Sequence, residues 1–323
     1  MKEGFERRIK GMLIGCAYGD AMGMPSEMMD EATFKKAFPK GITDLMPSSP
    51  YDFIGRRFKA GEVTDDTINT LLVCDAIIQN KGEFDTVKYL SLLRSWISKN
   101  SDKNPYIMGP STKKALEAIE GGMPIDEAGR SGTTNGSVMK VSPIGIISDL
   151  DHKDILIKNV KALCLPTHNT KIAISGACVI ASIVSYVIHG GTDIAEIWDL
   201  ADEILDMTDC EVLRTRIDEV RKILRDKGDE AIWVVNKQYG AGMETIETVP
   251  MVMLMITVSD LDPKKAALLS ANLYGDTDTI GSISTAICGA SGKEIGEEAT
   301  KTLIEVNGID FDHYANELAK YIK

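Results

Sequence analysis

Apolar residues at helical spacing are the feature of this sequence that most restricts its fold. They recur at intervals of three and four residues in two runs, which are Phe5, Ile9, Met12, Leu13 and Cys16, and Val87, Leu90, Leu93, Trp96 and Ile97. This spacing places the side chains on one face of an α-helix, whereas the alternating pattern of a half-buried strand is scarce in the chain. The sequence therefore predicts an all-α fold.

Capping residues and helix breakers mark further helices and the loops between them. Pro110, Ser111 and Thr112 begin a short helix that ends at Gly121 and Gly122, which is the expected start and stop chemistry. Further helices are predicted at residues 193–207, 211–226, 229–238, 244–258, 263–273, 278–290 and 310–322. Two long loops, at 38–64 and 121–136, are rich in loop-forming residues, and loops of this length in a helical protein are usually functional.

The length of 323 residues exceeds that of a usual domain, but length is only a soft guide to domain number. Apolar residues make up 44% of the chain, which is enough to bury a large core. No fixed-period repeat, low-complexity tract or convincing linker divides the sequence. We therefore predict a single domain over residues 1–323, built as a compact multi-helix bundle.

The charge and the cysteines restrict the partners and the compartment. A formal net charge of −12 argues against nucleic acid as a partner, and the basic cluster at 56–59 is too short to follow a phosphate backbone. Six scattered cysteines without a Cys-x-x-Cys pair predict reduced thiols. The uncharged segment Ile172–Ile188 contains serines and has no second span, so we interpret it as a buried core helix. We expect a cytoplasmic protein without a membrane partner.

An acidic segment stands immediately before an apolar helical run that begins at Ile68. The segment is Val63-Thr64-Asp65-Asp66-Thr67. Taken alone it is explained by helix capping, because Thr and Asp side chains accept backbone N–H bonds at an N-cap and the helix dipole favours carboxylates in the first turn.

A second segment, Gly275-Asp276-Thr277-Asp278-Thr279, repeats this chemistry at the start of another apolar helix. Like charges this close are tolerated mainly when a cation lies between them. An EF-hand is excluded, because Asp276 and Asp278 lack the later oxygen ligands of that loop. Carboxylate and hydroxyl oxygens without His or Cys favour Mg²⁺, with Mn²⁺ as a possible substitute. Two such ions about 3.5–4 Å apart can polarise a substrate oxygen and generate a water nucleophile.

Four blocks of residues, taken together, match one known family. The blocks are Gly15, Gly19, Asp20, Ala21, Gly23, Pro25 and Glu27; Thr64 to Thr67; Asn135 to Gly145 with Thr167 and His168; and Gly275 to Gly281. This combination resembles the ADP-ribosylglycohydrolase family, which includes the glycohydrolase that reactivates dinitrogenase reductase and the crystallin J1 relatives. The resemblance covers residues 5–290 and implies an all-α orthogonal bundle of that family's type.

The resemblance also implies a chemistry and a set of metal ligands. The implied ligands of a binuclear magnesium centre are Thr64, Asp65, Asp66, Asp276, Asp278 and Thr279. The implied reaction is hydrolysis of the N-glycosidic bond of an ADP-ribosyl group, in which the ions bind the ribose diol and activate the attacking water. Asp66 and Asp278 are candidates for the catalytic base. Glu27 matches a glutamate beside the family's metals that gates the substrate or takes part in proton transfer.

Further matched residues are expected to contact the substrate, although several have a purely structural alternative. They are Asp20, Asn135, Gly136, Ser137, Met139 and His168. Asp20 is equally explained as a buried anchor between a helix and a loop. Residues 135–137 are by composition a turn, but in the family this stretch lines the ribose and phosphate pocket, where backbone N–H groups suit phosphate. His168 is either a ligand contact or a structural histidine.

Three positions depart from the family's usual residues. Lys140 stands where relatives commonly have Arg, which replaces a bidentate fork by a point charge. Tyr274 and Thr285 stand where a small residue and a Gly are usual. These departures leave the leaving group and the diphosphate end of the substrate undetermined.

Three functions follow from these observations. The first is a hydrolase that acts on ADP-ribosylated protein or on a small ADP-ribose adduct. The second keeps the metal centre and takes a small N-riboside, such as a nucleoside in salvage, and is motivated by positions 140 and 274. The third is a non-catalytic ADP-ribose-binding or crystallin-like structural protein, against which the intact carboxylates count. The sequence does not determine the oligomeric state.

Overall fold

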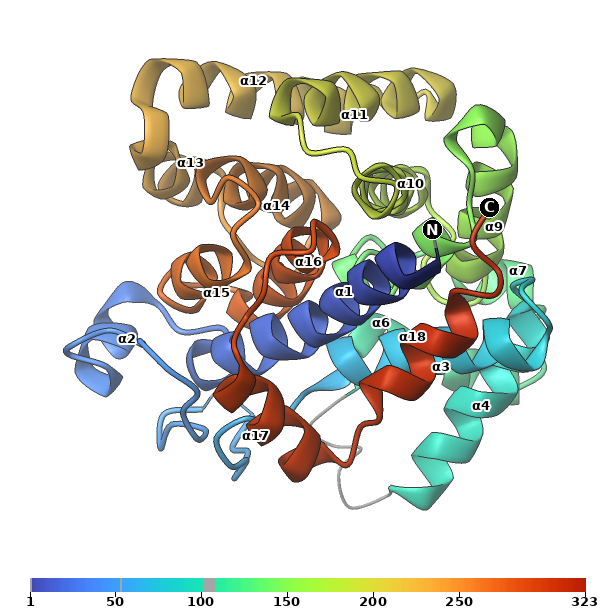
Figure 1. The fold of residues 1–323 in the computed structure, drawn as a ribbon, viewed down its shortest axis with the longest axis horizontal. Helices are drawn as coiled ribbons and strands as arrows, with labels where there is room; N and C mark the ends of the chain where they lie inside the picture. Colours follow the sequence, from blue (N-terminus) through green and yellow to red (C-terminus); the bar gives the residue numbers. More distant parts are fainter. Residues whose placement is uncertain (1, 53, 101–107) are drawn as a thin grey trace.

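The computed structural model describes residues 2–52, 54–100 and 108–323. Its helices (Figure 1) are α1 (Lys2–Gly23), α2 (Glu31–Ala37), α3 (Asp65–Gln79), α4 (Thr86–Lys99), α6 (Pro110–Glu120), α7 (Ile125–Ala128), α8 (Ser142–Ile146), α9 (Lys153–Cys164), α10 (Lys171–Ile188), α11 (Ile194–Thr208), α12 (Glu211–Lys227), α13 (Ala231–Tyr239), α14 (Thr245–Val258), α15 (Pro263–Ala271), α16 (Thr277–Ala290), α17 (Glu297–Asn307) and α18 (Phe311–Leu318). Within the described residues there is no β-strand, and two isolated bridges join Met29 to Gly275 and Thr134 to Glu244. The predicted all-α fold is confirmed.

Helices α1 and α16 pack against each other through the centre of the molecule (Figure 1). Glycines recur at every fourth position of α1, at Gly11, Gly15, Gly19 and Gly23. A Cβ atom at Gly19 would lie only 2.1 Å from the carbonyl oxygen of Gly281, so the two backbones approach too closely for any side chain at this position. This close packing places the end of α1, and the residues that follow it, beside the first turn of α16.

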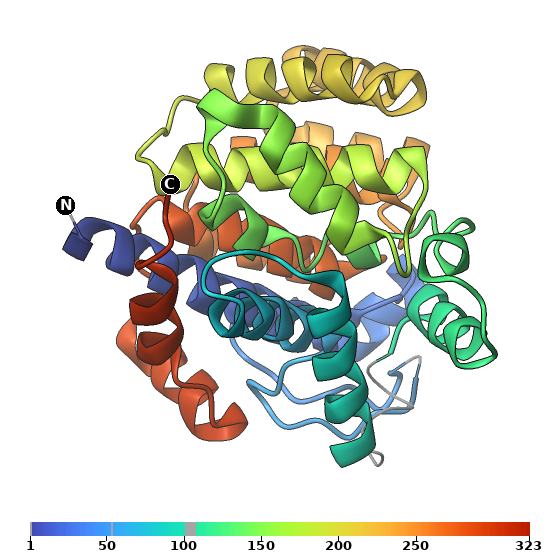
Figure 2. The same cartoon turned by 90° about the vertical axis from the view of Figure 1, so that its right-hand side faces the viewer.

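The other helices form layers around this central pair. Helix α10 packs against α8, α9, α11 and α14, and α12 packs against α13 and α14, so α11 and α12 form an outer layer on one side (Figures 1 and 2). Helices α17 and α18 cover the other side of α1, and α18 also contacts α3. Most buried apolar side chains form one large cluster that includes residues from all these layers, and Met24 and Phe58 form a second, small one. The single-domain span stays a prediction.

Most predicted helices are present, but five of the described helices were not predicted. The helices predicted at 193–207, 211–226 and 244–258 are α11, α12 and α14, with bounds that differ by one residue at most. Helices α2, α7, α8, α9 and α17 were missed, and α7 lies within the loop predicted at 121–136. In α2 only Phe34 is buried, and in α17 only Leu303, so the apolar periodicity that predicts a helix is too weak there.

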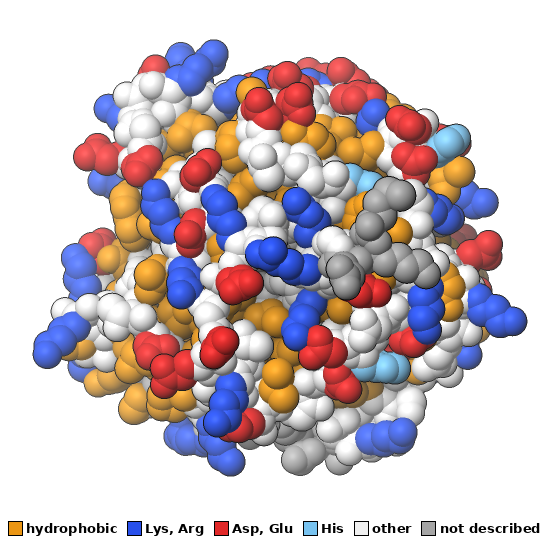
Figure 3. Space-filling model, viewed as in Figure 1, with side chains coloured by type: hydrophobic (Ala, Val, Ile, Leu, Met, Phe, Trp, Pro, Cys, Tyr) orange, Lys and Arg blue, Asp and Glu red, His pale blue; other side chains and the backbone are white. Residues whose placement is uncertain are grey.

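Helix α10 is the one described helix that is long and apolar enough to cross a membrane. Of its 18 residues, 78% are buried inside the protein, which confirms the interpretation as a core helix. On the face shown in Figure 3, Lys and Arg side chains are interspersed with Asp and Glu and form no continuous basic field among the described residues.

Candidate active site

The two acidic segments meet where α3 and α16 begin. Thr64 is the N-cap residue of α3, and Asp276 is that of α16. The carboxylate of Asp66 joins them, because its Oδ2 accepts hydrogen bonds of 3.3 Å from the hydroxyls of both Thr64 and Thr279. Two segments that are distant in the sequence therefore share one buried carboxylate, as the sequence predicted.

Asp20 caps α3 in place of the acidic segment's own residues. Neither Thr64 nor Asp276 caps the helix it precedes with its side chain. The carboxylate of Asp20, on α1, accepts hydrogen bonds from the backbone N–H groups of Thr64 (3.0 Å) and Thr67 (3.1 Å) and from the Thr67 hydroxyl (2.5 Å). Capping therefore does not explain these two residues. Asp20 is an anchor between α1 and α3, and its contact with substrate stays a prediction.

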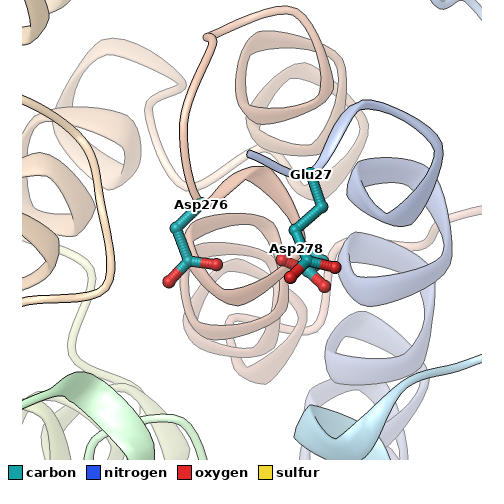
Figure 4. A group of neighbouring side chains, drawn as sticks. All are labelled: Glu27, Asp276 and Asp278. Carbon is teal, nitrogen blue, oxygen red and sulfur yellow. The ribbon is translucent and has the colours of Figure 1, made fainter. Parts of the chain in front are cut away.

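Glu27 lies against the second acidic segment because the chain after α1 is fixed to it. Met28 N–H donates to the Gly275 carbonyl at 2.6 Å, and Gly275 N–H donates to the Met29 carbonyl at 3.2 Å. Figure 4 shows Glu27 beside Asp278, with Asp276 facing the same space. One oxygen from each of these carboxylates lies within 4.8 Å of the other two, a spacing suited to a metal ion.

Burial raises the pKa of the carboxyl groups in this site. Desolvation, followed by the nearby charge of Glu27, raises the pKa of Asp65 to about 7 and that of Asp276 to about 6. Desolvation and neighbouring carboxylates raise the pKa of both Asp66 and Asp278 well above the usual range. A bound cation would replace the lost water around these groups and favour their charged forms.

One carboxylate oxygen of the site has no partner in the protein. Asp66 Oδ1 is buried and accepts no hydrogen bond. By contrast, Asp276 Oδ2 accepts a 2.6 Å hydrogen bond from the amide of Asn135, which also donates to the Thr248 hydroxyl at 2.9 Å. A buried charged oxygen without a donor is costly, and a hard cation is the partner that its chemistry fits.

A cleft of about 320 Å³ opens over these carboxylates. Its acidic end is lined by Glu27, Asp65, Asp66, Asp276, Asp278 and Thr279. The rest of its lining includes the apolar side chains of Met28, Ile54, Met108, Met139 and Met243, together with residues 109–112 at the start of α6. Its volume is at the low end of the roughly 300–1,000 Å³ that is typical of small-molecule sites.

Four of the predicted substrate contacts line this cleft, namely Asn135, Gly136, Met139 and His168. The ring of His168 is held on both sides, with Nε2 3.0 Å from the Thr134 hydroxyl and Nδ1 2.8 Å from the Thr167 hydroxyl. Burial, and secondarily Lys140, lowers the pKa of His168 to about 3, so the imidazole is neutral at physiological pH. Ser137 is fully buried and does not line the cleft.

Arg56 is a site residue that the sequence did not single out. Its side chain is 1% exposed and lines the cleft, with Nη1 2.5 Å from Glu27 Oε2 and 3.9 Å from Asp278 Oδ2. In the sequence it belongs to a short basic cluster in which Arg56 and Arg57 look alike. The one feature of the sequence that could have indicated Arg56 as a site residue is its position in the long loop before the first acidic segment, and this indication is weak.

The sequence as a whole matches a known family model. The model described as ADP-ribosylglycohydrolase matches residues 1–322. The chain belongs to the ADP-ribosylglycohydrolase family. Members of this family are glycosyl hydrolases that depend on a metal, so the chain is a glycosyl hydrolase, and the family assignment made from the four blocks is confirmed. The non-catalytic alternative is not supported.

Individual relatives span nearly all of the chain. The uncharacterised protein YegU of Escherichia coli K12 is 36% identical and covers 97% of each chain. The ADP-ribosylarginine hydrolase Tri1 of Pseudomonas putida GB-1 is 25% identical over 88% of this chain and 71% of its own. A solved structure titled an ADP-ribosylglycohydrolase-related protein complex superposes with a TM-score of 0.73, at 22% identity and 99% coverage of both chains, which supports the same fold.

The three positions that depart from the family's usual residues do not line the cleft. Lys140 is fully buried behind it, with Nζ 5.4 Å from the centre of the Tyr89 ring. The ring of Tyr274 lies between those of Phe34 and Trp233, outside the carboxylate cluster. Thr285 is buried in the seam between α1 and α16. Their influence on the substrate is therefore indirect.

Proposed function

We propose that this ADP-ribosylglycohydrolase family member is a magnesium-dependent hydrolase that cleaves the N-glycosidic bond of an ADP-ribosyl group on a protein or a small adduct. The observation that carries the proposal is the charge imbalance at the cleft. Buried carboxyl groups crowd its acidic end, while Arg56 is the one cationic side chain among the described residues that line it. Two divalent ions would restore the balance.

The proposed ligands are Thr64, Asp65, Asp66, Asp276, Asp278 and Thr279, and the unpartnered Oδ1 of Asp66 is among their donor atoms. When bound, the metal centre supplies Lewis acidity toward the ribose hydroxyls and a water of lowered pKa. Mn²⁺ prefers the same oxygen ligands and is a possible substitute.

The protein's own residues would orient the substrate and move the proton. Asp66 and Asp278 are the candidate bases, because both carboxylates lie at the acidic end of the cleft and burial raises the pKa of each well above its usual range. Glu27 lies beside Asp278 and would take part in proton transfer or gate the substrate. Asn135 holds Asp276 in place, and neutral His168 offers a ring edge to the ribose or phosphate.

The test is release of ADP-ribose from an ADP-ribosyl-arginine protein, with and without Mg²⁺. We expect turnover only with the metal, and none from Asp65→Ala or Asp278→Ala. Asp218→Ala, on the exposed face of α12, is the matched control and should behave as the wild type. Full activity in Asp65→Ala or Asp278→Ala would refute the site assignment, and turnover in the presence of a chelator would refute the metal dependence.

A second candidate substrate, a small N-riboside such as a nucleoside, is favoured by the cleft itself. The volume of about 320 Å³ is modest, and the guanidinium of Arg56 is already paired with carboxylates, so no free cation among the described lining residues faces a diphosphate. A nucleoside panel with Mg²⁺ distinguishes the two candidates through the free base released.

All six cysteines are free and buried, in keeping with the proposed cytoplasmic location.

A further inference from the structure

The loop around residues 48–58 is folded so that one arginine points inward. The ends of the loop are joined by hydrogen bonds between Ser48 and Phe58, of 3.0 Å from Ser48 N–H to the Phe58 carbonyl and 2.9 Å from Phe58 N–H to the Ser48 hydroxyl. Asp52 Oδ1 accepts from the backbone N–H groups of Ile54 (3.0 Å) and Arg56 (2.9 Å). Asp52 Oδ2 accepts from Arg56 Nε at 2.9 Å. Asp52 thus orients the Arg56 side chain toward Glu27.

The guanidinium of Arg56 connects three parts of the molecule. Nη1 pairs with Glu27 Oε2 at 2.5 Å and lies 3.9 Å from Asp278 Oδ2, and Nη2 donates to the carbonyl of Met24 at 3.3 Å. The side chains of Arg56 and Asp52 are each 1% exposed. A charge buried this deeply stays in place only if it is paired on several sides, so the loop, the end of α1 and the start of α16 are held together by this one group.

Arg56 places a fixed positive charge beside a candidate metal site. It faces Glu27 and Asp278, which belong to the one group of described carboxylates whose spacing suits a metal ion. A fixed positive charge next to a cation site opposes the binding of a second cation there. A neutral hydrogen-bond donor would position Glu27 without this cost, so the charge itself has a consequence for the site.

We propose that Asp52 and Arg56 form a latch, in which Arg56 is a positioning residue that holds Glu27 at the acidic end of the cleft and weakens divalent-cation binding at the Glu27, Asp276 and Asp278 face. This inference rests on the proposed function, since it concerns the same metal face. Because Ile54 and Arg56 both line the cleft, the latch also holds one of its walls closed.

The latch predicts effects of opposite sign on metal affinity and on catalysis. In Arg56→Gln the opposing charge is gone, and even under water-like screening a unit charge a few ångströms away changes divalent affinity by about ten-fold. We therefore expect Mn²⁺ to bind the metal-stripped protein about ten-fold more tightly, measured by calorimetry. With Glu27 no longer held, kcat should fall by about ten-fold or more, the usual effect of a lost supporting contact.

Two further variants separate charge from geometry. Arg56→Lys keeps the charge but not the planar fork, so Mn²⁺ affinity should stay near the wild-type value while kcat falls. Arg57→Gln removes a charge from the adjacent, exposed arginine and should change neither quantity. If Arg56→Gln binds Mn²⁺ as weakly as the wild type or more weakly, the latch is overturned. Equal losses of affinity and kcat in both Arg56 variants would show a merely structural role and also overturn it.

A measurement without metal keeps the latch separable from the proposed function. Phe58 is buried, while Arg57 before it is exposed, so trypsin cleaves after Arg57 only when the loop opens. In metal-free protein, Asp52→Asn should speed this cleavage several-fold, and the exposed-site control Asp44→Asn should not. Equal rates in Asp52→Asn and the wild type would overturn the latch. A wild-type protein that binds no Mn²⁺ would instead refute the proposed function and with it the metal half of this inference.

Discussion

The two acidic turns look alike in sequence but are supported differently in the structure. Around the first turn, the backbone N–H groups of Thr64 and Thr67 donate to the carboxylate of Asp20. Asp66 Oδ1, in the same turn, is buried and has no hydrogen-bond partner. Around the second turn, the amide of Asn135 donates to Asp276 at 2.6 Å and Arg56 lies near Asp278.

This difference indicates which of the two acidic turns depends more on a bound cation. The second turn is partly neutralised by side chains of the protein, whereas the first is left with an uncompensated carboxylate oxygen. Burial of an unpaired charge is costly, so the first turn depends more on an external cation than the second does. The following predictions either sharpen this contrast or break it.

The largest effect is expected from Asp66→Asn. Asp66 is the carboxylate that joins the two turns, so loss of its charge should remove a metal ligand and lower the rate of Mg²⁺-dependent ADP-ribose release by about 10³-fold, the order seen when a principal charge-stabilising group is lost. Initial rates at saturating Mg²⁺ measure it, with Asp218→Asn as the control. A loss of less than ten-fold would contradict the role of Asp66 as a metal ligand that joins the two turns.

A smaller effect is expected from Asn135→Ala. This change leaves every proposed ligand in place and removes only the amide that orients Asp276, so activity should fall by about 10–100-fold, as for other supporting contacts of metal ligands. Asn169→Ala, at an amide outside the cleft that donates to the Asp126 carbonyl, is the control. If Asn135→Ala is fully active, the protein's support of the second turn does not matter for catalysis.

The stability of the metal-free protein should distinguish the two turns by the size of the change. Asp66→Asn removes a buried carboxyl group whose pKa is raised well above its usual range and whose Oδ1 has no donor, so the free energy of unfolding should rise by about 1–3 kcal/mol. The pKa of Asp276 is also raised, but Asn135 donates to its carboxylate, so Asp276→Asn should raise the free energy of unfolding by less. Urea unfolding in the presence of a chelator measures both. A rise in Asp276→Asn that equals or exceeds the rise in Asp66→Asn would break the contrast.

The smallest effect concerns pH. The pKa of Asp20 and of Asp276 is raised to about 6 and that of Asp65 to about 7, chiefly by desolvation. The metal-free folded protein therefore keeps protons that the unfolded chain has lost, so the stability from these groups is lost as pH rises from about 4 to 7. Mg²⁺ takes the place of these protons. The stabilisation by Mg²⁺, the difference between melting curves with and without metal, should increase from pH 5 to pH 8, and a constant difference would contradict this.

The sequence predicted helices well where apolar faces are strong, and its failures have physical reasons. Helices α11, α12 and α14 have long apolar faces, whereas α17 buries only Leu303 and its periodicity is too faint to detect. The repetition of the acidic turns pointed to a shared site, although helix capping was the better explanation for the first turn taken alone. It took the structure to show that Asp20 caps α3.

The supporting contacts of the site were beyond the sequence. Arg56 and Arg57 are adjacent and identical, yet one is buried against Glu27 and the other is exposed, because Asp52 turns the loop. The hydrogen bond from Asn135 to Asp276 joins residues from opposite halves of the chain, and no local sequence pattern predicts it. A pattern of acidic and hydroxyl residues that occurs in two segments can be recognised in the sequence. Contacts between residues that only tertiary packing brings together cannot.

The central claim is that the two acidic turns hold a pair of hard cations between them. A crystal soaked in Mn²⁺ and measured at the manganese absorption edge tests it directly. We expect two anomalous peaks about 3.5–4 Å apart, bounded by Thr64, Asp65 and Asp66 on one side and by Asp276, Asp278 and Thr279 on the other. Turns that come together around no anomalous peak, or peaks that lie away from Asp66, would contradict the account.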